Sequence, residues 1–298
     1  MKYYTMREIR GCGTALITPF DDNLEVDWDS FGTLVRRQLD AGIDFLVLLG
    51  TTAETPCLED YEKEKLLATV TEINESKVPV VAGAGSNSTK KVIINISNLS
   101  KHNPDAFLVV VPYYNKPTQE GIFEHFKAIS ESTSAPIILY NIPYRTGVNM
   151  SVETTLRLAE LKNIIAVKEA SGNNEQISEI IRLAPGSFSV LSGNDDVTFS
   201  LMCTGGKGVI SVASNIAPSP IVKMTGLLSQ GRAEEAAVLH HRLMPLFKAC
   251  FVESNPIPVK SALALKCLIK NRLRLPLTRS AVQTDRLMES ILKDIEDL

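Results

Sequence analysis

The chain has 298 residues, of which 44% are hydrophobic and 22% are charged, and its formal net charge is −3 at pH 7. This composition is typical of a globular protein with enough apolar material for a large core. The acidic balance argues against nucleic acid as a partner, and no apolar run approaches the ~20 residues of a membrane span.

The chain begins MKYYTMREIRG, which carries charges but lacks the apolar core of a signal peptide, so we expect no secretion signal. The five cysteines are scattered without a C-x-x-C pair, which argues against a disulfide framework and against a zinc site. These features together predict a cytoplasmic protein.

Eight apolar, β-branched runs follow one another along the chain, and segments with helical spacing, such as Val92, Ile96 and Leu99, separate them. The runs are GTALIT near residue 13, FLVLLG near 45, PVVAGAG near 79, AFLVVVP near 106, PIILYN near 136, IIAVKEA near 164, SVLSGN near 189 and GVISV near 208. Eight strand–helix units predict a parallel sheet, and eight is the number that closes a (β/α)8 TIM barrel.

From about Gly231 the strand pattern ends, and three segments read as helices. We therefore predict an α/β fold with a barrel over residues 1–230 and a C-terminal three-helix extension over residues 231–298, packed on the barrel.

An open doubly wound sheet is the competing α/β architecture. It would be favoured by a G-x-G-x-x-G turn between the first strand and the first helix. GCGTALITPF leads into a strand, and GAGSNS, residues 83–88, lacks the third glycine. The barrel is the better interpretation.

Chemistry in such barrels lies at the C-terminal ends of the strands. The residues that follow the predicted strands there are Thr51 and Thr52 in GTTAET, Tyr113 and Tyr114 in PYYN, Tyr140 and Arg145 in YNIPYRTG, Lys168 in IIAVKEA, and Gly193 in LSGN.

Lys168 ends a run that is otherwise apolar, and strand alternation predicts that Ile164, Ala166 and Lys168 share one face. Burial lowers the pKa of a lysine from its usual ~10.4, and a neutral amine can form a Schiff base with a ketone. The simpler interpretation is a lysine that reaches water or pairs with Glu169. The neighbouring residues favour the catalytic one.

Tyr114 and Tyr140 offer hydroxyls that can relay a proton, with Thr51 or Thr52 between them. Arg145 can clamp a carboxylate, unless it is an ordinary loop charge. No H-x-H, H-E-x-x-H or carboxylate cluster is present in the sequence, so we expect no metal. The pattern predicts aldol chemistry through an iminium ion, without a cofactor.

The stretches GTTAET, PYYNKPTQEG, YNIPYRTG, IIAVKEASGN and LSGND resemble those of the dihydrodipicolinate synthase family, which belongs to the class I, lysine-dependent pyruvate aldolases. The resemblance extends to MPLF and FVESNPIPVK near the C-terminus and so covers nearly the whole chain. It implies condensation of pyruvate with L-aspartate 4-semialdehyde on the route to diaminopimelate and lysine.

The resemblance also implies a role for each matching residue. Lys168 would form the Schiff base with pyruvate; Thr51, Tyr114 and Tyr140 would relay protons; Thr52 would hold the pyruvate carboxylate; Arg145 would hold the carboxylate of the semialdehyde; Gly193 and Ile210 would line the pocket through their backbone. In the family Tyr114 enters the neighbouring subunit's site, which implies a homo-oligomer, usually a dimer of dimers.

Two relatives within the superfamily are alternatives. Sialic acid lyases carry GSTGE where this chain has GTTAE, and sugar-acid aldolases vary at Arg145. An arginine suits an acceptor with a carboxylate better than a polyhydroxylated one. A keto-acid sensor without activity would be expected to lose some of Lys168, Tyr114, Tyr140 and Thr51.

Ala53 replaces a glycine that is usual in the family, and we expect strain there if the position needs a positive φ.

Many members of the family bind lysine between subunits. The matching positions here are Thr55, Pro56, Asp60, Lys63, Asn87, Lys91 and Tyr113. Lys91 replaces a glutamate of lysine-sensitive members and Lys63 replaces a histidine, so two cations would repel a diamino acid. We expect weak inhibition by lysine or none.

Overall fold

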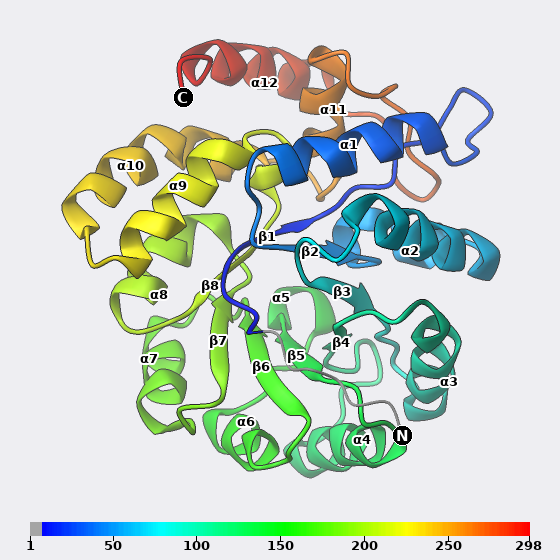
Figure 1. Ribbon diagram of the computed structural model, residues 1–298, viewed down its shortest axis with the longest axis vertical. Coiled ribbons are helices and arrows are strands. Elements are labelled where there is room, and N and C mark those ends of the chain that lie inside the picture. The colour runs from blue at the N-terminus through cyan, green and yellow to red at the C-terminus, as the bar shows by residue number, and fades with distance from the viewer. Residues whose placement is uncertain (1–7) are drawn as a thin grey trace.

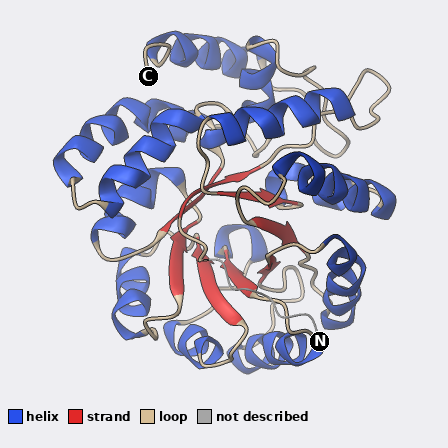
Figure 2. Ribbon diagram, viewed as in Figure 1, coloured by secondary structure: helices blue, strands red, loops and turns tan. Residues whose placement is uncertain are grey.

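The computed structural model describes residues 8–298, and residues 1–7, where the sequence predicts no secretion signal, lie outside that range. Eight parallel strands form a closed barrel in the order β1 to β8, and helices surround them (Figures 1 and 2). The strands are β1 Gly11–Ala15, β2 Phe45–Leu48, β3 Val80–Gly83, β4 Ala106–Val110, β5 Ile137–Asn141, β6 Ile164–Glu169, β7 Ser189–Ser192 and β8 Gly208–Ser211. The predicted (β/α)8 barrel is confirmed.

The helices that alternate with the strands pack on the outside of the barrel, except for the short α5, which lies within the ring of helices in Figure 1. They are α1 Trp28–Asp40, α2 Asp60–Asn74, α3 Thr89–Leu99, α4 Gln119–Ser132, α5 Pro143–Thr146, α6 Val152–Ala159, α7 Asn174–Leu183, α8 Thr198–Cys203 and α9 Pro218–Ser229. The Ser88 side chain caps α3 by accepting from the Lys91 N–H, and Val92, Ile96 and Leu99 form its buried stripe.

Three further helices follow the barrel: α10 Ala233–Ala249, α11 Ile257–Leu265 and α12 Val282–Asp294. Figure 1 shows α11 and α12 above α1, at one side of the barrel. Exposed ion pairs tie the segment between them to a loop of the barrel, because Lys270 and Arg272 contact Asp22 at 2.6 and 2.9 Å. The expected C-terminal helices are therefore present.

The core has two parts. Inside the barrel, side chains such as Phe45, Val81, Leu108 and Ile138 form a closed cluster, while a larger cluster fills the space between the strands and the helices. Because both faces of each strand are buried, the strands read as continuous apolar runs.

The predicted alternation along β6 is wrong at its start. Ile137 pairs with Ile164, but Ile138 pairs with Ala166, so Ile165 is an extra residue at an irregularity of the ladder. Ile164 consequently packs in the outer cluster, whereas Ala166 lies in the inner one. Ala166 and Lys168 keep the shared face that the sequence predicts.

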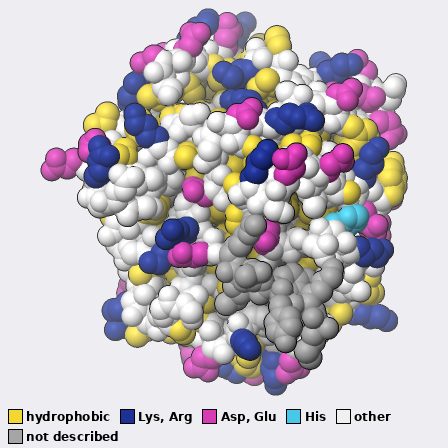
Figure 3. Space-filling view, in the orientation of Figure 1, with side chains coloured by type: hydrophobic (Ala, Val, Ile, Leu, Met, Phe, Trp, Pro, Cys, Tyr) yellow, Lys and Arg dark blue, Asp and Glu magenta, His cyan; other side chains and the backbone are white. Residues whose placement is uncertain are grey.

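Among residues 8–298, none of the helices combines the length and apolarity that crossing a membrane requires. On the face drawn in Figure 3, basic and acidic side chains are interspersed.

Candidate active site

A cavity of about 220 Å³ lies at the C-terminal ends of the strands. The lining includes six residues that the sequence predicts for the site: Thr51, Thr52, Tyr140, Arg145, Lys168 and Gly193. They lie at or just after the C-terminal ends of four strands, β2, β5, β6 and β7, so barrel closure brings together positions that lie far apart in the chain.

Lys168 is the second-last residue of β6, and only 5% of it is exposed. Its Nζ lies 4.3 Å from the centre of the Tyr140 ring on the neighbouring strand β5. Burial lowers the pKa of Lys168 from 10.5 to about 8; the charge of Asp195 opposes this shift and that of Arg145 adds to it. The amine is therefore far more often neutral than a lysine in water.

Tyr140 is buried beside this amine, and burial raises its pKa to about 12. The positive charge of Arg145 and a hydrogen bond with the Thr51 side chain oppose that rise. The phenol is thus protonated at neutral pH and is linked to Thr51, an arrangement that can pass a proton.

Arg145 belongs to α5, the short helix that follows β5, and lies 5.7 Å from the centre of the Tyr144 ring. Its guanidinium approaches the backbone oxygen of Asn255 at 3.5 Å, which leaves most of its donors for a ligand in the cavity. A planar guanidinium in this position can bind a carboxylate through two hydrogen bonds.

Asn255 is a lining residue that the sequence reasoning missed. It comes from the segment before α11, and its Nδ2 donates to Thr52 Oγ1 at 2.9 Å across 203 residues of sequence. The Thr52 oxygen accepts this bond, so the Thr52 proton remains for an acceptor in the cavity. The stretch FVESNPIPVK contains Asn255 and resembles the family, but nothing in it indicates contact with Thr52.

Gly193 follows β7, and its N–H donates to the Glu169 carbonyl at 2.8 Å. A Cβ here would lie 2.6 Å from the Ala170 Cβ and 3.1 Å from the Lys168 Cε, so the position next to the lysine needs glycine. Ile210 is fully buried in the inner core and is not among the residues that line the cavity.

Asp195 is a second group that the sequence reasoning did not select. It is 2% exposed and accepts from Ser211 Oγ at 2.5 Å and from the N–H groups of Val212 and Ala213, each at 3.0 Å. Burial raises its pKa, while these hydrogen bonds and the charge of Lys168 lower it. Asp195 holds the end of β8 and supplies negative charge near the lysine.

Tyr114 lies apart from this group. It is 88% exposed, has φ 74°, and lines neither this cavity nor the one described below. Within one chain, Tyr114 does not join Lys168 and Tyr140.

Within residues 8–298, no three His, Cys, Asp or Glu side chains gather closely enough to hold a metal ion.

The family model described as the dihydrodipicolinate synthetase family matches residues 8–295. The chain belongs to this family.

Individual relatives agree over the same length. The chain is 48% identical to the 4-hydroxy-tetrahydrodipicolinate synthase of Thermotoga neapolitana over 289 residues, which cover 96% of this chain and 98% of the relative. The structure resembles that of dihydrodipicolinate synthase from Thermotoga maritima with a TM-score of 0.95 and 47% identity, covering 97% and 99% of the two chains. A monomeric dihydrodipicolinate synthase variant gives a TM-score of 0.96 at 47% identity, with 99% of each chain covered.

Ala53 stands in the turn after β2, at the position where the sequence resemblance implies a glycine. The expected strain at Ala53 is absent, because Ala53 lies in a 3-10 helix, η1 Thr51–Ala53, without a positive φ. The left-handed residue is the next one, Glu54, with φ 54° and ψ 35°.

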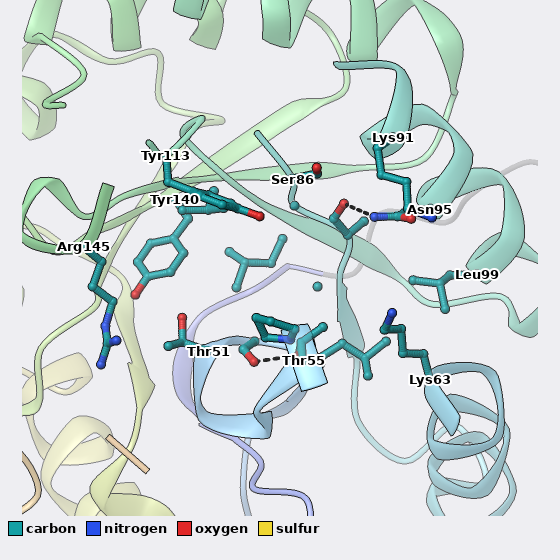
Figure 4. A pocket seen from close by; sticks show the side chains of 18 of the residues that line it. Thr51, Thr55, Lys63, Ser86, Lys91, Asn95, Leu99, Tyr113, Tyr140 and Arg145 are labelled. Carbon is teal, nitrogen blue, oxygen red and sulfur yellow. Dashed lines mark hydrogen bonds between the residues drawn. The ribbon is translucent and has the colours of Figure 1, made fainter. Parts of the chain in front are cut away.

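A second cavity of about 330 Å³ adjoins the first and shares Thr51, Tyr140 and Arg145 with it. Figure 4 shows Tyr140 and Arg145 at one end and Lys63 and Lys91 at the other. Six of the seven positions that match the family's lysine site line it: Thr55, Pro56, Asp60, Lys63, Lys91 and Tyr113. Asn87 does not line it, and its backbone oxygen accepts from Asn115 Nδ2 at 3.0 Å.

At the far end of this cavity, one aspartate pairs with two lysines. Asp60 contacts Lys63 Nζ at 2.9 Å and Lys91 Nζ at 3.9 Å. Asp60 therefore faces two ammonium groups, while Glu64, the other carboxylate of the lining, pairs with Lys101 at 3.6 Å.

Proposed function

We propose that this chain condenses pyruvate with L-aspartate 4-semialdehyde, the 4-hydroxy-tetrahydrodipicolinate synthase reaction, on the route to diaminopimelate and lysine. The observation that carries the proposal is a buried amine, Lys168, in one cavity with Tyr140 and Arg145. Relatives that are 48% identical over nearly the full chain carry the name of this activity.

In the proposed reaction the neutral amine of Lys168 attacks the C2 carbonyl of pyruvate, and water leaves to give an iminium ion. Loss of a proton from C3 gives an enamine. C3 of the enamine then forms a bond to the aldehyde carbon of the semialdehyde, whose oxygen takes up a proton, and C2 becomes an iminium carbon again. The amino group of the former semialdehyde attacks C2, closes the six-membered ring and displaces the amine of Lys168, which is released for the next turnover. No step needs an oxidant or a reductant.

Each remaining residue has a proposed role. Tyr140 and Thr51 pass protons, together with Tyr114 of the partner subunit; Thr52 donates to the pyruvate carboxylate; Arg145 binds the carboxylate of the semialdehyde; the backbone at Gly193 and Ile210 shapes the pocket. The exposure of Tyr114 in the single chain supports a homo-oligomer, with a dimer of dimers as the expected form. We place the protein in the cytoplasm.

The test is a coupled assay. Pyruvate and L-aspartate 4-semialdehyde are supplied with excess dihydrodipicolinate reductase, and NADPH consumption is followed. We expect turnover that Lys168→Ala abolishes and that Lys293→Ala, a change at an exposed lysine of α12, leaves intact. If the folded protein shows no turnover, the proposal fails, and sugar acids become the substrates to examine.

We further propose that lysine inhibits this enzyme weakly or not at all. Lys63 and Lys91 at the second cavity would repel the ammonium groups of lysine. The double variant Lys63→His/Lys91→Glu removes both cations, and we expect it to become more sensitive to lysine. Inhibition of the unchanged protein at sub-millimolar lysine would contradict this proposal.

A further inference from the structure

The turn that carries Thr51 and Thr52 is held by a buried side chain two residues further on. Glu54 joins the 3-10 helices η1 Thr51–Ala53 and η2 Thr55–Cys57 in the left-handed conformation, which costs free energy for any residue with a Cβ. Such strain persists where surrounding contacts over-determine the backbone, and it gathers at functional sites. The contacts here are made by the Glu54 carboxylate.

Glu54 forms a fully buried ion pair with Lys260 of α11. Lys260 Nζ lies 2.5 Å from Glu54 Oε1, and both side chains are 0% exposed. The same ammonium group donates to the Arg272 carbonyl at 3.0 Å and lies 4.1 Å from the centre of the Phe20 ring. The other oxygen of Glu54 accepts from the Arg274 N–H at 3.0 Å.

The C-terminal segment thus reaches the threonine turn at two points. Lys260 and Arg274 hold Glu54, and Asn255 donates to Thr52 Oγ1. Asn255 and Lys260 lie within one turn of the start of α11, so a shift of α11 would move both contacts together. The turn that they hold lines the catalytic cavity.

We propose that Glu54 and Lys260 are positioning residues whose buried ion pair fixes the Thr51–Thr52 turn and thereby sets the affinity of the site for the pyruvate carboxylate. A buried ion pair often stabilises a fold no better than well-packed apolar residues of similar volume. We therefore assign its place next to the cavity to the geometry of the turn and not to stability. The inference rests on the proposed function in one respect, which is that pyruvate is the ligand.

The test distinguishes an effect on the position of the Thr51–Thr52 turn from an effect on the stability of the fold. The double variant Glu54→Gln/Lys260→Met keeps both shapes and leaves no unpaired charge, so we expect it to fold with a loss of stability limited to the hydrogen bond that Lys260 donates to the Arg272 carbonyl. Its KM for pyruvate should rise about ten-fold, the effect of weakening one hydrogen bond to a carboxylate. Its KM for the semialdehyde should change less than its KM for pyruvate.

A second variant, Glu54→Asp, keeps the charge and shortens the side chain, and the same rise in the pyruvate KM is expected. The matched control is Asp22→Asn/Lys270→Met, which removes an exposed ion pair between the same C-terminal segment and a loop that does not carry the threonines. This control should leave both KM values unchanged.

A further measurement needs pyruvate alone. Borohydride traps the pyruvate adduct on Lys168, and mass spectrometry measures how the amount of adduct depends on the pyruvate concentration. An adduct whose pyruvate dependence is unchanged in either Glu54 variant would overturn the positioning role and leave the proposed function standing. Absence of any trapped adduct in the unchanged protein would overturn both.

Discussion

The chemistry at the scale of single residues depends on the protonation of Lys168. With a pKa of about 8, about one amine in ten is neutral at pH 7, compared with about three in ten thousand for a lysine whose pKa is 10.5. Burial is the main cause of the lowered pKa; the charge of Asp195 raises the pKa and that of Arg145 lowers it further. The site therefore makes the amine nucleophilic near neutral pH.

The rate of Schiff-base formation should rise with pH until the Lys168 pKa is passed. Because the neutral amine is the nucleophile, kcat/KM for pyruvate should increase about ten-fold per pH unit below pH 8 and level off above it. The measurement is the coupled assay at low pyruvate across this range. A profile that does not change with pH would contradict the assignment.

Two variants should move this profile in opposite directions. Arg145→Met removes a cation that lowers the Lys168 pKa, so the inflection should move to higher pH. Asp195→Asn removes an anion that raises the pKa, so the inflection should move to lower pH. Since both are read from the shape of the profile, loss of overall activity does not obscure the result.

Lys168→Met should stabilise the fold while abolishing activity. The pKa of Lys168 is lower in the folded chain than in the unfolded one, so protonation opposes folding, and this cost is fully present below pH 8 and disappears as pH rises toward 10.5. At pH 7 its removal is worth up to about 3 kcal/mol. Chemical denaturation checks this value, and a gain that did not shrink between pH 7 and pH 10 would contradict the explanation.

At the scale of elements, the strands could be predicted from the sequence because a strand that is buried on both faces consists of a continuous run of apolar residues. The sequence did not predict the irregularity in β6, since the extra residue, Ile165, is as apolar as its neighbours and only pairing with β5 identifies it. It also placed the expected strain at Ala53 and not at Glu54, because the substitution of a usual glycine is visible in sequence and a buried ion pair is not.

Closure of the barrel between β8 and β1 requires glycine at position 208. A Cβ there would lie 2.0 Å from the Gly11 carbonyl oxygen, and its φ of 153° disfavours any side chain. Gly208→Ala should destabilise the fold by about 2 kcal/mol or more, in the range of overpacking. Gly226→Ala in α9, where a Cβ meets nothing within 4 Å, is the control and should stabilise it by about 0.5–1 kcal/mol. Equal effects in thermal unfolding would refute the closure argument.

At the scale of the whole molecule, the site draws on parts of the chain that no local pattern connects. Asn255 and Thr52 are 203 residues apart, and their contact exists only because α11 lies beside the mouth of the barrel. The motif resemblance could therefore name the groups at the strand ends, but it could not identify what positions them. Tyr114 is the opposite case: the resemblance assigns it a role, and the single chain leaves it exposed.

If Tyr114 acts in the partner's site, two inactive variants should restore one another. A subunit with Tyr114→Phe keeps Lys168, and a subunit with Lys168→Met supplies Tyr114. After the two are mixed equally and refolded, half of the dimers are mixed and each has one complete site, so about one quarter of the native activity should return. The matched control mixes a Lys168→Met subunit with an Arg145→Met subunit. Both residues line the cavity of one chain, so no mixed dimer of this pair is expected to have a complete site. Recovery in both mixtures, or in neither, would show that Tyr114 does not act across the interface.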